Sequence, residues 1–148
     1  MLKEMEAISK DFSYNEFQSS KVALEKGIDN TIPSGSVKES IKVLTLNVLQ
    51  PLRDRYGKPL IVSSGYRSAE LNMAVGGATE SQHVKGEAAD ILCNSPAELA
   101  QIAYGMKLPY DQMILYPTFV HFSHKLQGRQ RGQILYNKSY IGPKVKTI

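Results

Sequence analysis

The chain lacks any apolar run long enough to cross a membrane. A bilayer core takes about 20 predominantly apolar residues, and no such stretch occurs in the 148 residues of this sequence. The opening residues, MLKEMEAISKDF, also lack the apolar stretch of a secretory signal peptide. We therefore expect no stable membrane insertion and no export signal, with synthesis in the cytoplasm.

Cysteine is almost absent, because Cys93 is the one thiol of the chain. A single cysteine cannot form an internal disulfide, and Cys93 ends an apolar run in which a free cysteine usually behaves as a small core residue. We expect no catalytic role for it. Internal repeats and low-complexity segments are also missing, which excludes solenoids and disordered arrays.

The size and charge of the chain narrow the function classes further. With 42% hydrophobic residues, 148 residues can bury one core and leave little room for a second domain. We expect residues 1–10 to be an N-terminal extension, residues 11–148 to form one domain, and the protein to be a monomer. The net charge of +4 invites a nucleic-acid partner, but the basic residues are spread out rather than clustered. The charge suits a surface facing an anionic polymer, or a solvated surface without a partner, and we expect no nucleic acid.

The first half of the chain predicts one secure helix after an irregular segment. Residues 11–35 are rich in turn-forming residues and are expected to be mostly loop. Ser36 and Glu39 have the spacing of a capping box, and apolar residues recur downstream at helical spacing. Pro51 should kink or end this helix, although a turn beyond it is possible.

The rest of the chain alternates short strands with helices. The segment 59–65 predicts a buried strand, 68–74 a short helix and 87–93 a second strand. Ser95, Pro96 and Glu98 mark the start of a helix that runs to about Met106. A β-hairpin at 112–116 and 119–123 and a last strand at 133–136 follow. This order predicts an α+β fold, a single domain with a mainly antiparallel sheet packed against helices.

Histidine is scarce, and the contexts of His83 and His121 are hard to explain by packing. His83 precedes Asp90 by seven positions, with Gly86 between them to permit a tight turn. Asp90 lies within the apolar run AADIL, where an inward carboxylate is costly without a partner. A metal ion is one such partner.

His121 interrupts the apolar strand FVHFS in the same way. Two imidazoles and one carboxylate would leave a fourth tetrahedral position for water, as catalytic zinc sites require. The alternative is that both histidines are ordinary core residues and Asp90 a salt-bridge member or helix cap; each context alone favours this, but the two together favour a metal. His124 lies on the opposite face of a straight strand from His121, and could approach the site only through a bulge at Ser123.

Three motifs in this sequence resemble those of the M15 zinc metallopeptidases, whose fold is shared with the Hedgehog signalling domain. SQHVKGEAAD, from Ser81 to Asp90, is similar to the family signature S-x-H-x(6)-D. SGYRS, residues 64–68, resembles the family's S-G-[YF]-R-S motif, and FVHFS, residues 119–123, resembles its W-V-H-V-S segment. They occur in the family's order, and the resemblance extends over roughly residues 11 to 137.

The resemblance implies a function and a set of site residues. His83, Asp90 and His121 would bind Zn²⁺, Arg67 would act in catalysis by facing the substrate carbonyl, and Ser81 would bind the substrate peptide. The implied substrate is the peptidoglycan stem peptide, cut by a D,D-carboxypeptidase or an endopeptidase. With no visible signal peptide, such an enzyme would reach the bacterial cell wall by phage-type or prophage-type lysis.

The sequence departs from the family where many members carry a general base. Three residues before the last histidine ligand, where a Glu or Asp is usual, this chain has Thr118. Threonine cannot accept a proton near pH 7, so the role falls to Asp111, to His124 if the strand bulges, or to the zinc-bound water with Arg67 alone. Thr118 also keeps a second function open, a zinc-bearing, non-catalytic wall-binding module. An alternative for Arg67 is a surface salt bridge to Glu70.

Overall fold

The sheet that carries the fold has five strands in the order β3-β4-β6-β5-β7. The structure is a computed structural model and describes residues 6–147. The strand bounds are Ile61–Ser64 for β3, Ala88–Leu92 for β4, Gln112–Leu115 for β5, Phe119–Ser123 for β6 and Gln133–Tyr136 for β7. All neighbours pair antiparallel except β5 and β7, which are parallel. The α+β fold with a mainly antiparallel sheet is confirmed.

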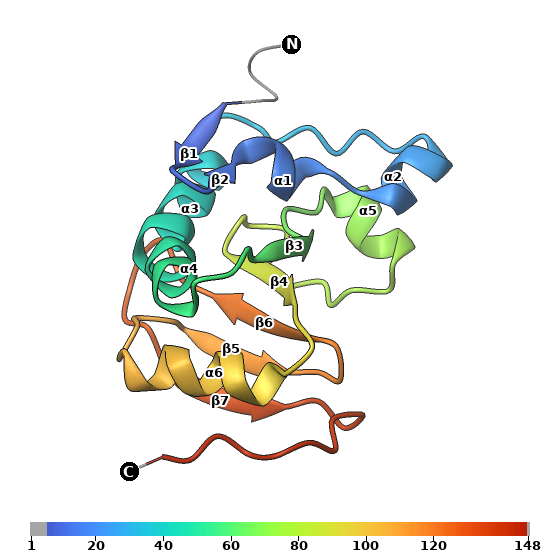
Figure 1. Ribbon diagram of the computed structural model, residues 1–148. Helices are drawn as coiled ribbons and strands as arrows, with labels where there is room; N and C mark the ends of the chain where they lie inside the picture. The colour runs from blue at the N-terminus through green and yellow to red at the C-terminus, as the bar shows by residue number, and fades with distance from the viewer. Residues whose placement is uncertain (1–5, 148) are drawn as a thin grey trace.

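The helices cover the sheet from one side and one end (Figure 1). Helix α3, Ser36–Leu44, continues through the π-helical segment η2, Thr45–Leu49, into α4, Gln50–Tyr56. Helix α6, Pro96–Gly105, packs against β5, β6 and α4. Among residues 6–147, no helix combines the length and apolar character that crossing a bilayer requires.

The structure corrects one expectation for the long helix and decides between the alternatives left open for another. The capping box at Ser36 does not form, because the helix begins at Ser36 itself and its N-cap is Gly35, at φ 96°, without a side-chain cap. Pro51 does not end the helix either. It lies in the first turn of α4, directly after the π-helical segment, where its missing N–H is tolerated.

Residues 11–35 are more regular than expected. They contain β2, Phe12–Ser13, and the helices α1, Tyr14–Gln18, and α2, Lys21–Lys26. Strand β1, Ala7–Ser9, lies within the segment expected to be an N-terminal extension, and it pairs with β2. These elements are only two to six residues long, which is too short for a hydrophobic period to reveal.

The strand at 59–65 is correctly placed, but it is not buried. β3 pairs with β4 alone and forms an edge of the sheet, and the Ile61 side chain is 57% exposed. The short helix α5, Ala69–Ala74, follows as expected, and the Ser68 hydroxyl caps it by accepting the Leu71 N–H.

The two faces of the sheet differ in chemistry, as strand alternation requires. One face carries fully buried apolar side chains that pack into the main core: Ala89, Ile91, Met113, Leu115, Val120 and Phe122. The opposite face of β4 and β6 carries Asp90 and His121, which are directly paired across the two strands. The candidate site therefore lies on the face of the sheet that the main core leaves free.

Candidate metal centre

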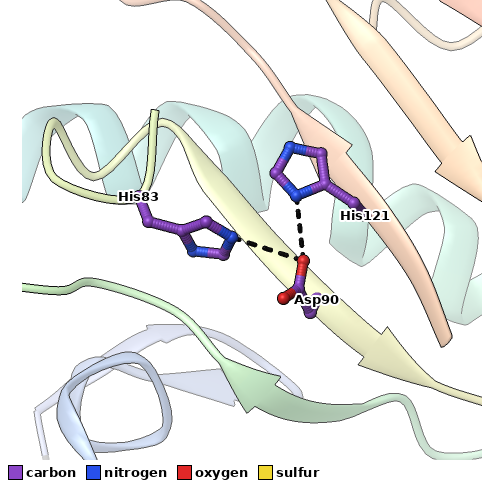
Figure 2. A group of neighbouring side chains, drawn as sticks. All are labelled: His83, Asp90 and His121. Carbon is purple, nitrogen blue, oxygen red and sulfur yellow. Dashed lines mark hydrogen bonds and ion pairs between the residues drawn. The ribbon is translucent and has the colours of Figure 1, made fainter. Parts of the chain in front are cut away.

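His83, Asp90 and His121 come together at the centre of the sheet, as Figure 2 shows. Each offers one ligand atom, and these three atoms lie within 4.8 Å of one another. Asp90 comes from β4 and His121 from β6, while His83 lies in the turn before β4. The sheet register thus fixes two of the side chains, and the turn delivers the third.

The turn that carries His83 depends on a close approach to helix α3. Gly86 has φ +75°, and a Cβ there would lie 2.6 Å from the Val37 carbonyl oxygen. Only glycine combines this left-handed conformation with so little space. The expected tight turn at Gly86 is therefore present.

The hydrogen bonds of His83 direct one ring nitrogen toward Asp90. Its Nδ1 lies 2.7 Å from the Gly65 carbonyl oxygen. Because a carbonyl only accepts, Nδ1 carries the proton and Nε2 keeps a free lone pair. Nε2 is buried without a hydrogen-bond partner, although it is 3.3 Å from Asp90 Oδ1. The lone pair of Nε2 therefore faces the Asp90 carboxylate, which can only accept hydrogen bonds. A cation bound between the two groups would satisfy both.

The remaining distances also fit a shared cation. His121 Nδ1 lies 2.9 Å from Asp90 Oδ1, and the ring centroids of His83 and His121 are 5.1 Å apart. Two ligands with bonds of about 2.0–2.1 Å to one zinc ion can be separated by up to about 4.2 Å. Both distances to Asp90 lie inside this limit, and two imidazole nitrogens with one carboxylate oxygen are ligands that zinc takes.

The electrostatics keep Asp90 ionised. Burial alone would raise the pKa of the Asp90 carboxyl, but the neighbouring imidazoles of His121 and His83 outweigh it and hold the pKa well below its usual range. A metal ligand must be deprotonated. Asp90 therefore has the charge state that binding requires across the neutral pH range.

Arg67 is held beside these residues by polar contacts rather than by an ion pair. Its Nη1 donates to Asn72 Oδ1 at 2.8 Å and its Nε to Ser64 Oγ at 3.4 Å. A Cβ on Gly77 would lie 2.5 Å from Nη1, so the loop closes tightly over the guanidinium. Within residues 6–147, no ion pair joins Arg67 to Glu70. The negative charge of Asp90 acts on the partly buried guanidinium without a direct ion pair.

Ser81 stabilises the turn that carries His83. Its hydroxyl oxygen accepts the backbone N–H of His83 at 3.2 Å. That bond uses the oxygen as an acceptor and leaves the hydroxyl proton available for a substrate carbonyl. The expected substrate contact of Ser81 therefore stays a prediction.

The structure narrows the candidates for a general base. Asp111 is fully buried and accepts hydrogen bonds from Gln82 and from the backbone and guanidinium of Arg131. Its oxygens are occupied, so it is not free to take a proton. The side-chain nitrogen Nε2 of His124 lies 3.3 Å from Asn47 Nδ2. The backbone N–H of His124 donates to the Glu87 carbonyl oxygen and so continues the regular pairing of the two strands. The strand does not bulge, and His124 stays off the face of His121.

A pair of aromatic residues beside the site was not anticipated. Tyr116 stacks on Phe119 with ring centroids 4.2 Å apart, and alternation places Phe119 on the face of His121. Burial, and next the negative charge of Asp90, raise the pKa of the Tyr116 phenol. The two-residue connection of the hairpin, Pro117 and Thr118, was the available signal, since it pairs Tyr116 with Phe119.

Comparisons with known proteins agree with this geometry. The sequence model of the peptidase M15 family matches residues 10–124, which include all three motifs. The chain is also 38% identical over 73 residues to the zinc D-Ala-D-Ala carboxypeptidase of Streptomyces albus G. That alignment covers 47% of this chain and 29% of the Streptomyces protein, so the chain spans less than a third of its relative. The family match covers most of the chain, and the chain therefore belongs to the peptidase M15 family.

Proposed function

We propose that this protein is a zinc-dependent peptidase that hydrolyses peptide bonds in the peptidoglycan stem peptide. The observation that carries the proposal is the buried, unpartnered Nε2 of His83, aimed at Asp90 and next to His121. Family membership supports the peptidase class, and the name of the Streptomyces relative supports zinc and a D-Ala-D-Ala substrate. The proposal covers both a carboxypeptidase, which cuts a terminal bond, and an endopeptidase, which cuts an internal one.

His83, Asp90 and His121 would hold the ion. Zinc bound by three protein ligands lowers the pKa of a coordinated water to about 7 and polarises carbonyl groups. The chain's own contribution is orientation, because Gly65 fixes the tautomer of His83 and the sheet register fixes Asp90 against His121.

Arg67 would stabilise the negative charge that develops on the substrate carbonyl oxygen. Its guanidinium is oriented by Asn72 and Ser64, and among residues 6–147 it forms no direct ion pair. A preorganised donor of this kind acts most strongly where charge appears in the transition state. Ser81 would donate its hydroxyl proton to the substrate backbone.

The proposal is tested with purified wall peptides. Zinc-loaded protein should release new amino groups, EDTA should abolish the release, and added Zn²⁺ should restore it. Mass spectrometry of the products identifies the bond. Intact peptides after long incubation with protein shown to contain one zinc per chain would refute the enzymatic activity.

Two observations support a second function, a zinc-bearing module that binds the wall without cutting it. Thr118 stands where the carboxylate base is usual, and Asp111 is occupied by Arg131. Sedimentation with insoluble wall separates the two functions. A binding module would sediment with the wall and release no amino termini, whereas an enzyme would release them.

A further inference from the structure

A hollow adjoins the metal centre and extends beyond the residues that have been given a role so far. It has a volume of about 480 Å³, and its lining includes Asp90 and Arg67. Its walls come from the link between α1 and α2, the end of β3, and α5 with the following glycine loop. Figure 1 shows α2 and α5 on the same side of the molecule, beyond the end of β3.

The charges that line the hollow are of one sign apart from the metal ligand. Lys21 and Arg67 are the cations among its lining residues, and Asp90 is its one carboxylate. Within residues 6–147, neither cation forms an ion pair. Once Asp90 is neutralised by a cation, the hollow is electropositive and suits an anionic group.

The hydroxyl groups of the hollow add donors of the right kind. Ser20 Oγ accepts the Ala23 N–H, and Ser64 Oγ accepts from Arg67. Each of these hydroxyls keeps its own proton for an outside acceptor. Ser19 and Ser63 differ, because their hydroxyls already donate to backbone carbonyls. A carboxylate accepts hydrogen bonds and donates none, so it matches Lys21, Ser20 and Ser64 together.

We propose that this hollow binds a carboxylate group of the peptide substrate, with Lys21 as the cation that selects it and Ser20 and Ser64 as the neutral donors. The inference rests on the proposed function for the nature of the ligand. The carboxylate has two possible sources, the free C-terminus of the peptide or an acidic side chain within it. Because the hollow adjoins Asp90, the bound carboxylate lies next to the bond that the metal centre would attack, and it would select among wall peptides.

The test measures binding, independently of hydrolysis. Isothermal titration of the zinc-loaded full chain uses N-acetyl-D-alanyl-D-alanine and its C-terminal amide. A second pair carries D-glutamate or D-glutamine before an amidated D-alanyl-D-alanine. The wild type should bind the acid of one pair about tenfold or more tightly than its amide, and the pair that discriminates identifies the source.

Charge reversal then assigns the preference to Lys21. Lys21→Glu should remove the discrimination, and the milder Lys21→Gln should reduce it, with zinc content unchanged. Lys26→Glu is the matched control, because Lys26 lies on the same helix α2, is exposed, and does not line the hollow. It should keep the wild-type preference.

Failure of this inference differs from failure of the proposed function. Equal binding of acid and amide in both pairs would overturn the hollow's assignment, even in a protein that cuts wall peptides. An equal loss of preference in the Lys21→Glu and Lys26→Glu proteins would overturn it too, by showing a general charge effect. Carboxylate discrimination without any hydrolysis would uphold the hollow and refute the peptidase.

Discussion

His83 and His124 show how one residue type takes two roles in the same small domain. Both are buried, and both have one ring nitrogen without a hydrogen-bond partner. His83 faces Asp90 and His121, whereas His124 contacts Asn47 of the π-helical segment. The neighbours of each ring decide its function.

This contrast gives a matched pair of substitutions. His83→Ala should lower zinc affinity by more than the roughly 10–100-fold that loss of an outer partner costs, because it removes a ligand. His124→Ala should leave zinc binding within a few fold. Zinc content after dialysis, and competition with a chromogenic chelator, measure both. Equal zinc loss in the two proteins would argue that the metal is held elsewhere.

Arg67 offers a second prediction at the residue scale. Arg67→Ala should lower kcat for wall peptides by on the order of 100-fold, because it removes a donor aimed at the developing oxyanion. Its zinc content should be unchanged, since Arg67 is not a ligand. The exposed Arg129 provides the control, and Arg129→Ala should retain activity. If activity survives in Arg67→Ala, charge stabilisation must come from the ion alone.

At the scale of elements, the turn between His83 and β4 is the part of the site most sensitive to shape. It must reverse the chain directly against helix α3, and Gly86 supplies both the conformation and the space. Strands β4 and β6 are less demanding, because their regular register places Asp90 opposite His121 without any special residue. A small change in side-chain size should therefore disturb the site more in this turn than in the sheet.

Gly86→Ala should destabilise the protein by on the order of 3 kcal/mol, since the left-handed strain adds to a clash with the Val37 carbonyl. Gly132→Ala is the control. Gly132 also has positive φ, at +65°, but a Cβ there meets nothing within 4 Å, so only about 1 kcal/mol of strain is expected. Urea unfolding measures both. Equal losses in the two proteins would show that packing of the turn on α3 contributes nothing.

For the molecule as a whole, the ion pair of Asp111 and Arg131 joins the approach to β7 to the rest of the sheet. Arg131 binds both oxygens of the fully buried Asp111, which also accepts from Gln82, the residue before His83. A contact far from the metal in sequence thus supports the turn that carries a ligand. We regard the pair as structural.

The pH dependence of stability should follow this pair. Burial would raise the pKa of the Asp111 carboxyl, but hydrogen bonds from Arg131 outweigh it and hold the pKa below its usual range. A lowered folded-state pKa means that the stabilisation is present above the unfolded value of about 3.9 and is lost as pH falls through the folded value. Asp111→Asn should therefore cost on the order of 1–3 kcal/mol at pH 7.

The difference between Asp111→Asn and the wild type should shrink below about pH 4. Urea unfolding of metal-free protein from pH 7 to pH 3 measures it, with EDTA present to remove zinc linkage. Glu25→Gln, at an exposed carboxylate, should show little change at any pH. A difference that stays constant down to pH 3 would contradict ionisation of Asp111 as its source.

The sequence alone determined the longer elements and the residues brought to the metal centre. Helix α6 begins at its Ser95 cap, the hairpin of β5 and β6 forms where expected, and His83, Asp90 and His121 are the three side chains that converge. These elements and site residues depend on local capping and turn signals and on motifs of neighbouring residues. Such features survive in a one-dimensional pattern because the interactions behind them span only a few positions.

Tertiary structure alone decided what surrounds those residues. The buried Asp111 is occupied by a residue twenty positions away, β3 lies at an edge, and the hollow is bordered by segments distant in sequence. The burial of a side chain, its hydrogen-bond partners and the electrostatic potential around it depend on neighbours that only the folded chain brings together. The sequence could therefore name the side chains that we propose as metal ligands, but only the packing of distant segments showed that Asp111 is occupied and which segments border the hollow.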